Sequence, residues 1–203
     1  MRIEKQNIER DKKMKHLTRE TYLQSATEYL APHFTNLGYP LPKTRVSVGI
    51  PAGGKGGKLK RIGECWSNLA SADNTTEIFI CPSQSNAVDV LAILLHELIH
   101  AAVGLECGHK GAFKRVALSI GLTGKMTATV PGPALTKDLQ SLADTLGEYP
   151  HAALNTALSG RKKQNTRMIK LTCDDCGWSC RTAQKNVDAG LPTCHCGGLI
   201  NQA

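Results

Sequence analysis

The chain has 203 residues, 41% of them hydrophobic, and a formal net charge of +8. This length accommodates one mid-sized domain and an appendage, with enough apolar residues for a packed core. No stretch reaches the roughly eighteen apolar residues of a membrane span, and the charged segment Met1 to Glu20 lacks the apolar run of a signal peptide. We therefore expect an intracellular protein that neither spans a membrane nor is secreted.

The first part of the chain predicts one helix followed by three strands. After a basic lead over residues 1–17, apolar residues at helical spacing predict a helix from Thr18 to Leu37, ended by Gly38 and Pro40. Strands are expected at Thr44 to Ile50, Arg61 to Asn68 and Thr75 to Cys81. The glycine-rich basic stretch 53–58 lacks the spacing of a P-loop and is interpreted as a mobile hairpin loop.

The apolar run from Val88 to Val103 contains His96-Glu97-Leu98-Ile99-His100, an HExxH pentapeptide. Two histidines four apart lie on one face of a helix and can hold a zinc ion, and the glutamate can then reach a water molecule at the metal. Buried imidazole and carboxylate groups need partners, which a metal and its water supply. The alternative is a pair of histidines at the edge of the core, hydrogen-bonded to carbonyl groups.

A catalytic zinc usually takes three protein ligands, so a third must come from elsewhere. The helix is expected to end near Gly104, and the candidates that follow closely are Glu106, Cys107 and His109. Phe113, Val116, Ala117 and Ile120 predict a second helix, which places His109 at its entry and within reach of the first pair.

The C-terminal part carries Cys173-x-x-Cys176 and, later, Cys194-His195-Cys196. Two close cysteine pairs at this separation predict a structural zinc site in a ribbon of short strands, with Cys180 and His195 as substitutes in the second pair. The alternative, disulfide pairing, requires an oxidising compartment. The scattered Cys65, Cys81 and Cys107 are interpreted as small buried hydrophobes, with Cys107 singled out because it lies beside the proposed metal.

Periodicity and composition also predict the domain limits. Leu135, Leu139, Leu142 and Leu146 repeat on one face of a helix that ends near Gly147. The predicted organisation is therefore a domain over residues 18–150, a basic linker over 151–167 and a zinc ribbon over 168–203. The predicted fold class is α+β: an N-terminal helix, a short antiparallel sheet, the HExxH helix and the helices after it.

From about Thr18 to Gly132 the chain resembles the SprT-like zinc metallopeptidases, the family that includes Spartan. The resemblance rests on HELIH, a short turn, and His109 with Phe113 four residues later, as in the family's His-Gly-x-x-Phe setting. The chain differs in having Lys110 directly after the histidine and the glycine one position later. The strands around Gly63-Glu64-Cys65-Trp66 and Glu77-Ile78-Phe79-Ile80 and the C-terminal ribbon fit the same family.

The resemblance implies that the α+β domain is a small zincin-like metallopeptidase core. It also implies an endopeptidase that acts on DNA-associated proteins or DNA–protein crosslinks, with one catalytic and one structural zinc. His96, His100 and His109 would hold the catalytic metal, with Glu106 in reserve, and Glu97 would be the general base. The family occurs in bacteria, their viruses and eukaryotes, and the compact chain favours a cytoplasmic protein of bacterial or viral source. We expect a monomer.

Basic residues are concentrated in the N-terminal lead, the glycine-rich loop and the linker, which is typical of loops and tails that bind a phosphate backbone. The candidate nucleic-acid contacts are Lys55, Lys58, Lys60, Arg161, Lys162, Lys163 and Trp178. Trp178 can stack on a base or pack in the ribbon core, and Trp66 can line the cleft or face the core.

Two other functions remain open at this stage. One is a non-catalytic nucleic-acid-binding adaptor whose HExxH zinc is structural; the other is a transcription-associated zinc protein, suggested by the ribbon alone. Spacing does not identify the residue that stabilises the oxyanion, for which Tyr149 and the segment Lys125 to Val130 are guesses.

Overall fold

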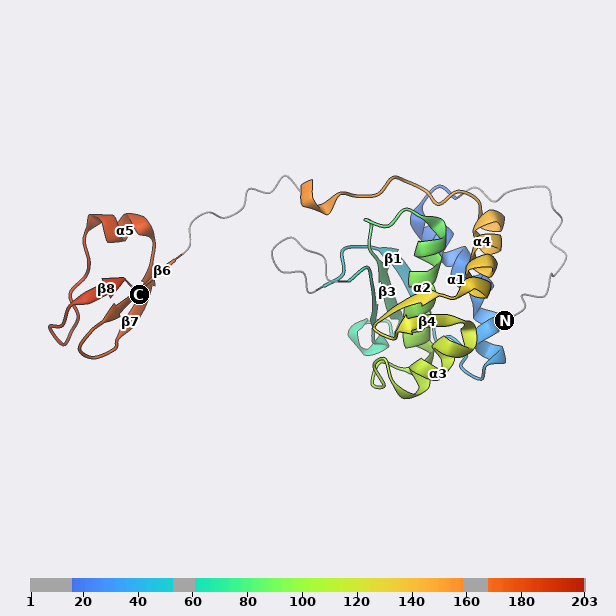
Figure 1. The fold of residues 1–203 in the computed structure, drawn as a ribbon, viewed down its shortest axis with the longest axis horizontal. Helices are drawn as coiled ribbons and strands as arrows, with labels where there is room; N and C mark the ends of the chain where they lie inside the picture. The colour runs from blue at the N-terminus through green and yellow to red at the C-terminus, as the bar shows by residue number, and fades with distance from the viewer. Residues whose placement is uncertain (1–15, 53–60, 159–167, 203) are drawn as a thin grey trace. The chain divides into compact units, whose positions relative to one another are not determined.

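The computed structural model describes residues 16–52, 61–158 and 168–202. The chain divides into two compact units, Met1–Ala157 and Leu158–Ala203 (Figure 1). The predicted α+β class is confirmed. Within the described ranges, no helix is both long enough and apolar enough to cross a membrane.

The first unit contains four helices and five strands among its described residues. The helices are α1 (Arg19–Asn36), α2 (Ala87–Val103), α3 (Gly111–Ile120) and α4 (Pro133–Leu146). The strands are β1 (Thr44–Val48), β2 (Gly63–Trp66), β3 (Thr76–Ile80), β4 (Leu122–Lys125) and β5 (Ala128–Pro131). A short 3-10 helix, η1 (Asn68–Ala70), also belongs to it, and a second, η2 (Thr156–Leu158), spans the boundary between the two units in the sequence.

The sheet of β1, β2 and β3 is mixed, not antiparallel as predicted. Its order is β1-β3-β2; β1 pairs with β3 in parallel and β2 pairs with β3 antiparallel. Parallel neighbours need a crossover connection, and here the segment that contains β2 provides it. β3 takes the central place because its alternate side chains, Thr76, Ile78 and Ile80, are buried. β2 is left as an outer strand.

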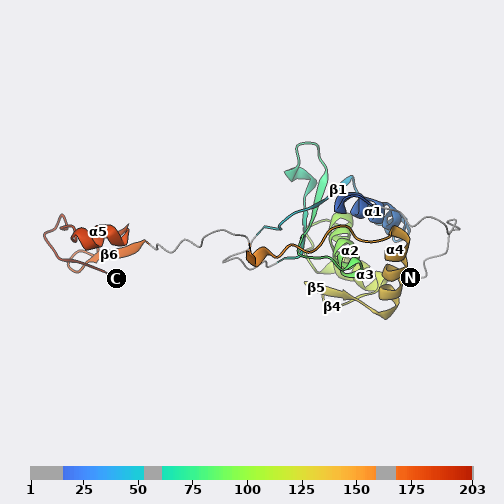
Figure 2. The ribbon, with the colours of Figure 1, turned by 90° about the horizontal axis from the view of Figure 1, so that it is seen from above.

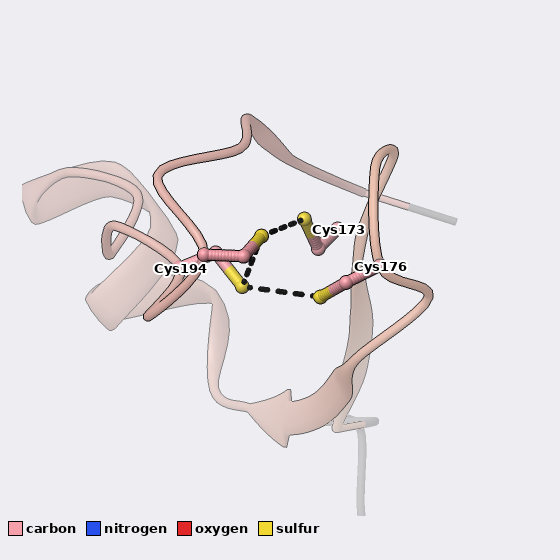
Figure 3. Close-up of side chains that lie close together, drawn as sticks. Cys173, Cys176 and Cys194 are labelled. Carbon is pink, nitrogen blue, oxygen red and sulfur yellow. Dashed lines mark hydrogen bonds between the residues drawn. The ribbon is translucent and has the colours of Figure 1, made fainter.

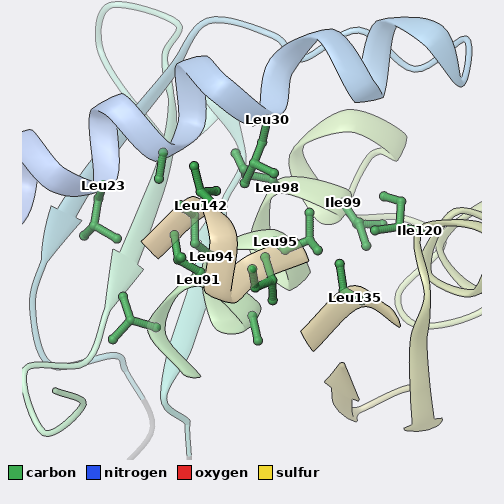
Figure 4. Packing of buried hydrophobic residues seen from close by; sticks show 14 of the residues in the cluster. Leu23, Leu30, Leu91, Leu94, Leu95, Leu98, Ile99, Ile120, Leu135 and Leu142 are labelled. Carbon is green, nitrogen blue, oxygen red and sulfur yellow. The ribbon is translucent and has the colours of Figure 1, made fainter. Parts of the chain in front are cut away.

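Helix α2 lies at the centre of the first unit. It contacts α1, α3, α4, β2 and β3, so it buries apolar side chains over most of its circumference. Figure 4 shows leucines of α2 packed between side chains of α1 and α4. The helix begins after Asn86, whose side chain accepts a hydrogen bond from the Asp89 amide, and ends at Gly104, which has a φ of +88°.

The strands β4 and β5 form a hairpin that periodicity did not predict. Leu122 pairs with Pro131 and Gly124 with Thr129, and the amide of Gly132 donates to the carbonyl of Gly121 at 2.9 Å. The view from above in Figure 2 shows this hairpin next to α3. It follows directly on α3 and leads into α4.

The first unit extends beyond residue 150, so the segment predicted as linker begins inside it. The guanidinium of Arg19, only 5% exposed, donates to the carbonyls of Pro82, Pro150 and Ala152 at 3.0, 3.1 and 2.7 Å. The amide of Leu154 donates to the Pro82 carbonyl at 2.9 Å. Composition could not predict that these residues belong to the first unit. The hydrogen-bond acceptors of Arg19 are backbone carbonyls, which every residue has.

The second unit is a small three-stranded antiparallel sheet with one short helix. Its elements are β6 (Ile169–Cys173), β7 (Ser179–Thr182), α5 (Gln184–Ala189) and β8 (Ile200–Gln202), with strand order β7-β6-β8. Its buried core consists of Leu171, Cys173, Cys194 and Ile200. A core of this size is small for an independent fold, and small domains of this kind generally require a metal or disulfides.

Candidate metal centres

The structure brings His96, His100 and His109 together. The Nε2 atom of His109 lies 3.2 Å from the Nε2 atoms of both His96 and His100. A single ring nitrogen has one hydrogen or one lone pair, so it cannot satisfy two such neighbours by ordinary hydrogen bonds. Nitrogens bound to one tetrahedral zinc at about 2.05 Å lie about 3.3 Å apart, so the three side chains fit a metal ion.

His109 reaches the other two histidines because the chain turns sharply after α2. Gly104, Gly108 and Gly111 all have positive φ, and His109 lies one residue before Lys110, the N-cap of α3. Of the other candidate third ligands, Glu106 lies against Gly104 and Cys107 Sγ lies 3.4 Å from the Gly104 carbonyl. Neither belongs to the histidine group.

The apolar ring of Phe113 packs against all three histidines. Its ring, fully buried, lies 4.9, 4.4 and 5.0 Å from the ring centroids of His96, His100 and His109. Phe113 follows His109 by four residues in the sequence, and this spacing brings its ring into contact with the His109 ring.

The environment keeps the imidazoles neutral. Burial, followed by the neighbouring histidine charge, lowers the pKa of His96 to about 4 and that of His100 to about 3, and burial also lowers the pKa of His109. Metal ligation requires neutral imidazole with a free lone pair. The Nδ1 atom of His96 lies 2.9 Å from Thr129 Oγ1, whereas that of His100 is buried without a partner in the described part of the chain.

Glu97, next to His96 in the sequence of α2, is buried, with 7% of the residue exposed. Burial and the charge of Glu64 raise its pKa to about 8, opposed by Arg61 and the Cys65 amide. Strand β2 passes very close: a Cβ on Gly63 would lie 2.6 Å from Glu97 Oε1. Sequence reasoning noted this strand but missed its contact with Glu97, for which the only signal was a glycine inside a strand.

Glu64 is held by neighbours of its own. Its carboxylate pairs with Arg61 and accepts from the amide of Ala52 at 2.9 Å. A second carboxylate therefore lies near Glu97, with its charge partly balanced.

The four cysteines Cys173, Cys176, Cys194 and Cys196 form the second group. The Sγ distances are 3.6 Å from Cys173 to Cys196 and 3.5 Å from Cys176 to Cys194 (Figure 3). A disulfide measures about 2.05 Å, whereas thiolates on one tetrahedral zinc lie about 3.7 Å apart. All four are free thiols in the structure, so the arrangement is one that can bind a metal ion.

Neither substitute ligand joins the cysteine group. Cys180 packs against the ribbon core, and His195 Nδ1 lies 3.7 Å from Cys194 Sγ. Gly198 lies so close to the cysteine group that it leaves no room for a side chain, since a Cβ at this position would lie 2.8 Å from Cys173 Sγ. Backbone amides, that of Cys176 first, lower the pKa of Cys173 to about 7, whereas the pKa values of Cys194 and Cys196 are raised by the neighbouring thiols and by burial, so Cys173 loses its proton before these two.

Of the three scattered cysteines, Cys81 is buried as predicted, whereas Cys65 and Cys107 are half-buried against the core. Cys81 is fully buried, and burial followed by the charge of Glu97 raises the pKa of Cys65 to about 12. A thiol with so high a pKa is a poor nucleophile at neutral pH.

The other predicted positions have mixed outcomes. Trp178 is 43% exposed and is not part of the ribbon core, and Trp66 is equally exposed. Tyr149 contacts Tyr22 and Arg19, not the histidines, whereas the segment Lys125 to Val130 reaches them through Thr129. The six candidate nucleic-acid contacts Lys55, Lys58, Lys60, Arg161, Lys162 and Lys163 lie outside the described residues.

Comparisons of the sequence with family models and curated proteins, and of the fold with solved structures, returned no match.

Proposed function

We propose that the protein is a zinc-dependent endopeptidase of SprT-like type that acts on DNA-associated proteins. One observation carries this proposal: the side chains of His96, His100 and His109 converge, and the buried glutamate Glu97 lies on the helix that bears two of them. A purely structural site has no need for a carboxyl group next to its first ligand. Three ligands also leave a position free for water, as in catalytic zinc sites.

A zinc ion at this site would supply Lewis acidity to water and to a peptide carbonyl. His96, His100 and His109 would hold it. The Glu97 carboxylate would accept a proton from the attacking water and then donate it to the nitrogen of the leaving amine. Phe113 excludes water from the side of the histidines that faces the core.

The outer strand β2 is the proposed place for the substrate backbone. It is the edge of the sheet in the order β1-β3-β2, and it runs past Glu97 at Gly63. An extended peptide can add to such an edge as a further strand. The exposed ring of Trp66 at the end of β2 would contact a side chain of that peptide.

The ribbon supports the proposal of DNA as partner. Lys170 of β6 and Arg181 of β7 lie directly opposite each other, and neither forms an ion pair with any described residue. Like charges opposite each other are destabilising, and a phosphate group between them relieves the repulsion. Exposed Trp178 can stack on a base.

The test is a cleavage assay with the zinc-loaded protein and a DNA-bound basic protein, with and without single-stranded DNA. Wild type should give DNA-stimulated fragments. Glu97→Gln should keep its zinc but lose cleavage by roughly 10²–10⁴-fold, because it lacks the general base. Glu106→Gln, the same change at an exposed glutamate outside the histidine group, is the matched control and should cleave normally.

Two outcomes would contradict the proposal. Undiminished cleavage by Glu97→Gln would remove the assigned role of this residue. DNA binding without fragments from either protein would instead favour the nucleic-acid-binding adaptor, whose recognition surface would be the ribbon face around Lys170 and Arg181.

A further inference from the structure

The β4–β5 hairpin contacts the histidine group at one point that the proposed function does not use. Thr129 of β5 places its Oγ1 2.9 Å from His96 Nδ1, and β5 packs against α2. The hairpin register sets Thr129 opposite Gly124. The pairing of β4 with β5 thus places the Thr129 hydroxyl next to His96, a candidate metal ligand.

The Thr129 hydroxyl can accept a hydrogen bond from His96 Nδ1 or donate one to it, but only the first arrangement leaves Nε2 free to bind a metal. A neutral imidazole has one N–H, and an Nδ1–H that donates to a hydroxyl leaves the lone pair on Nε2. In His96 that Nε2 faces His109 at 3.2 Å, where a metal ion would lie. Such outer contacts orient metal-binding histidines, and their loss typically weakens metal binding 10–100-fold.

The two histidines of α2 differ in this respect. The Nδ1 atom of His100 is buried without a hydrogen-bond partner among the described residues, so packing alone orients its ring. Of the two histidines of α2, only His96 therefore has a hydrogen-bond partner at Nδ1 among the described residues.

We propose that Thr129 is a positioning residue for the metal centre: its hydroxyl holds His96 in the tautomer and orientation that present Nε2 to the metal. The proposal rests on the metal centre of the proposed function, but not on peptidase activity. The β4–β5 hairpin then acts as part of the metal site.

The test measures the zinc affinity of the full chain by competition with a chromophoric chelator. The chain should bind two zinc ions, and the step that His100→Ala removes is assigned to the histidine group. Thr129→Val keeps the shape and strand preference but lacks the hydroxyl, so this step should weaken 10–100-fold. Thr129→Ser, which keeps the hydroxyl, should bind nearly as tightly as wild type.

Thr127→Val is the matched control, because Thr127 is an exposed threonine in the turn of the same hairpin. It should leave both zinc steps unchanged. Nitrogen-15 NMR of the metal-free protein gives a second measurement: His96 should be a single Nδ1–H tautomer in wild type and Thr129→Ser, and a mixture in Thr129→Val.

Equal affinities of Thr129→Val and Thr127→Val would overturn the proposal, as would a Thr129→Ser protein that binds as weakly as Thr129→Val. A wild type that binds zinc only in the ribbon would overturn both the metal centre and the proposed function. A wild type that binds two zinc ions and cleaves nothing would contradict the peptidase alone, because the affinity comparison requires no cleavage.

Discussion

The two candidate metal centres are built in opposite ways. The histidine group provides three ligands, two on α2 in the middle of a large apolar core and the third just before α3, and α2 also carries the buried carboxyl group of Glu97. The cysteine group lies in a unit whose buried core has four residues, two of them proposed ligands, and it provides a closed set of four thiols.

The fold would position the metal ligands in the first unit, whereas the metal would stabilise the fold of the second. In the first unit, packing can hold the ligands in place before any ion binds, so the ion is free to serve chemistry. In the second unit the ligands are themselves half of the core, so the ion would serve stability. The following predictions test this contrast.

The largest expected effect is loss of the ribbon fold on metal removal. Structural zinc contributes about 10–16 kcal/mol in small zinc-dependent folds, so chelation should unfold residues 168–202 and leave the first unit folded. The two tryptophans report separately: Trp66→Phe leaves Trp178 as the probe of the ribbon, and Trp178→Phe leaves Trp66 as the probe of the first unit. Cys176→Ser should mimic chelation, and Cys180→Ala, outside the cluster, should not. Simultaneous unfolding of both units would abolish the contrast.

Phe113→Ala should strongly destabilise the first unit. The ring is fully buried and contacts all three histidines, and removal of a buried phenylalanine costs about 3–5 kcal/mol of unfolding free energy. Urea unfolding monitored by Trp66 fluorescence measures the loss. Leu118→Ala changes a half-exposed residue of the same helix and should cost far less. Equal losses of unfolding free energy in the two variants would show that the packing of Phe113 does not hold the histidines in place.

Gly63→Ala should disturb the approach of β2 to α2. The new Cβ would lie 2.6 Å from Glu97 Oε1 and 2.7 Å from Ile93 Cγ2, and overpacking of this kind costs about 1–3 kcal/mol. Combined with Glu97→Ala, which removes the nearer atom, the same substitution should cost less than in wild type. A double-mutant cycle by urea unfolding measures this coupling, and strict additivity would argue against the close contact.

The smallest predicted effect is a pH dependence in the metal-free protein. The folded protein keeps a proton on Glu97 up to about pH 8, whereas the unfolded chain loses it near its ordinary pKa of 4.5. The folded state thus binds more protons in this range, so the free energy of unfolding falls as pH rises. Between pH 7.5 and 8.5, where His96, His100 and His109 of the unfolded chain have already lost their protons, the fall should be about 0.5–1 kcal/mol.

Glu97→Gln should remove this slope, because glutamine does not titrate. Zinc should also remove it in wild type, because a nearby cation favours the carboxylate and lowers its pKa. Unfolding curves at several pH values, with and without zinc, would check both. A slope that persists in Glu97→Gln would assign it to another group.

Local spacing predicted the parts of both centres that lie close together in the sequence. His96 and His100 follow from the helical repeat, and the cysteine pairs from their separation. The bounds of α1 and α2 also agree with the predictions within about two residues at most ends, because capping residues such as Thr18 and Gly104 mark them.

Features that depend on tertiary contacts were not predictable in this way. The parallel pairing of β1 with β3, the contact of Thr129 with His96 and the approach of Gly63 to Glu97 join elements that are distant along the chain. Hydrophobic periodicity tells which face of an element is buried, but not which neighbour covers it. The hairpin β4–β5 was missed for the same reason, since its strands are short and mostly exposed.

Arg19 determines how far the chain must extend for the first unit to be complete. Its buried guanidinium is satisfied by carbonyls on both sides of residue 150, so a fragment cut at Pro150 would leave a cation in the interior with part of its partners missing. An independently folding fragment of the first unit should therefore retain at least Leu154, whose amide donates a hydrogen bond to the same Pro82 carbonyl. A protease that nicks the chain between His151 and Leu154 would loosen α1, although the cut lies far from it in sequence.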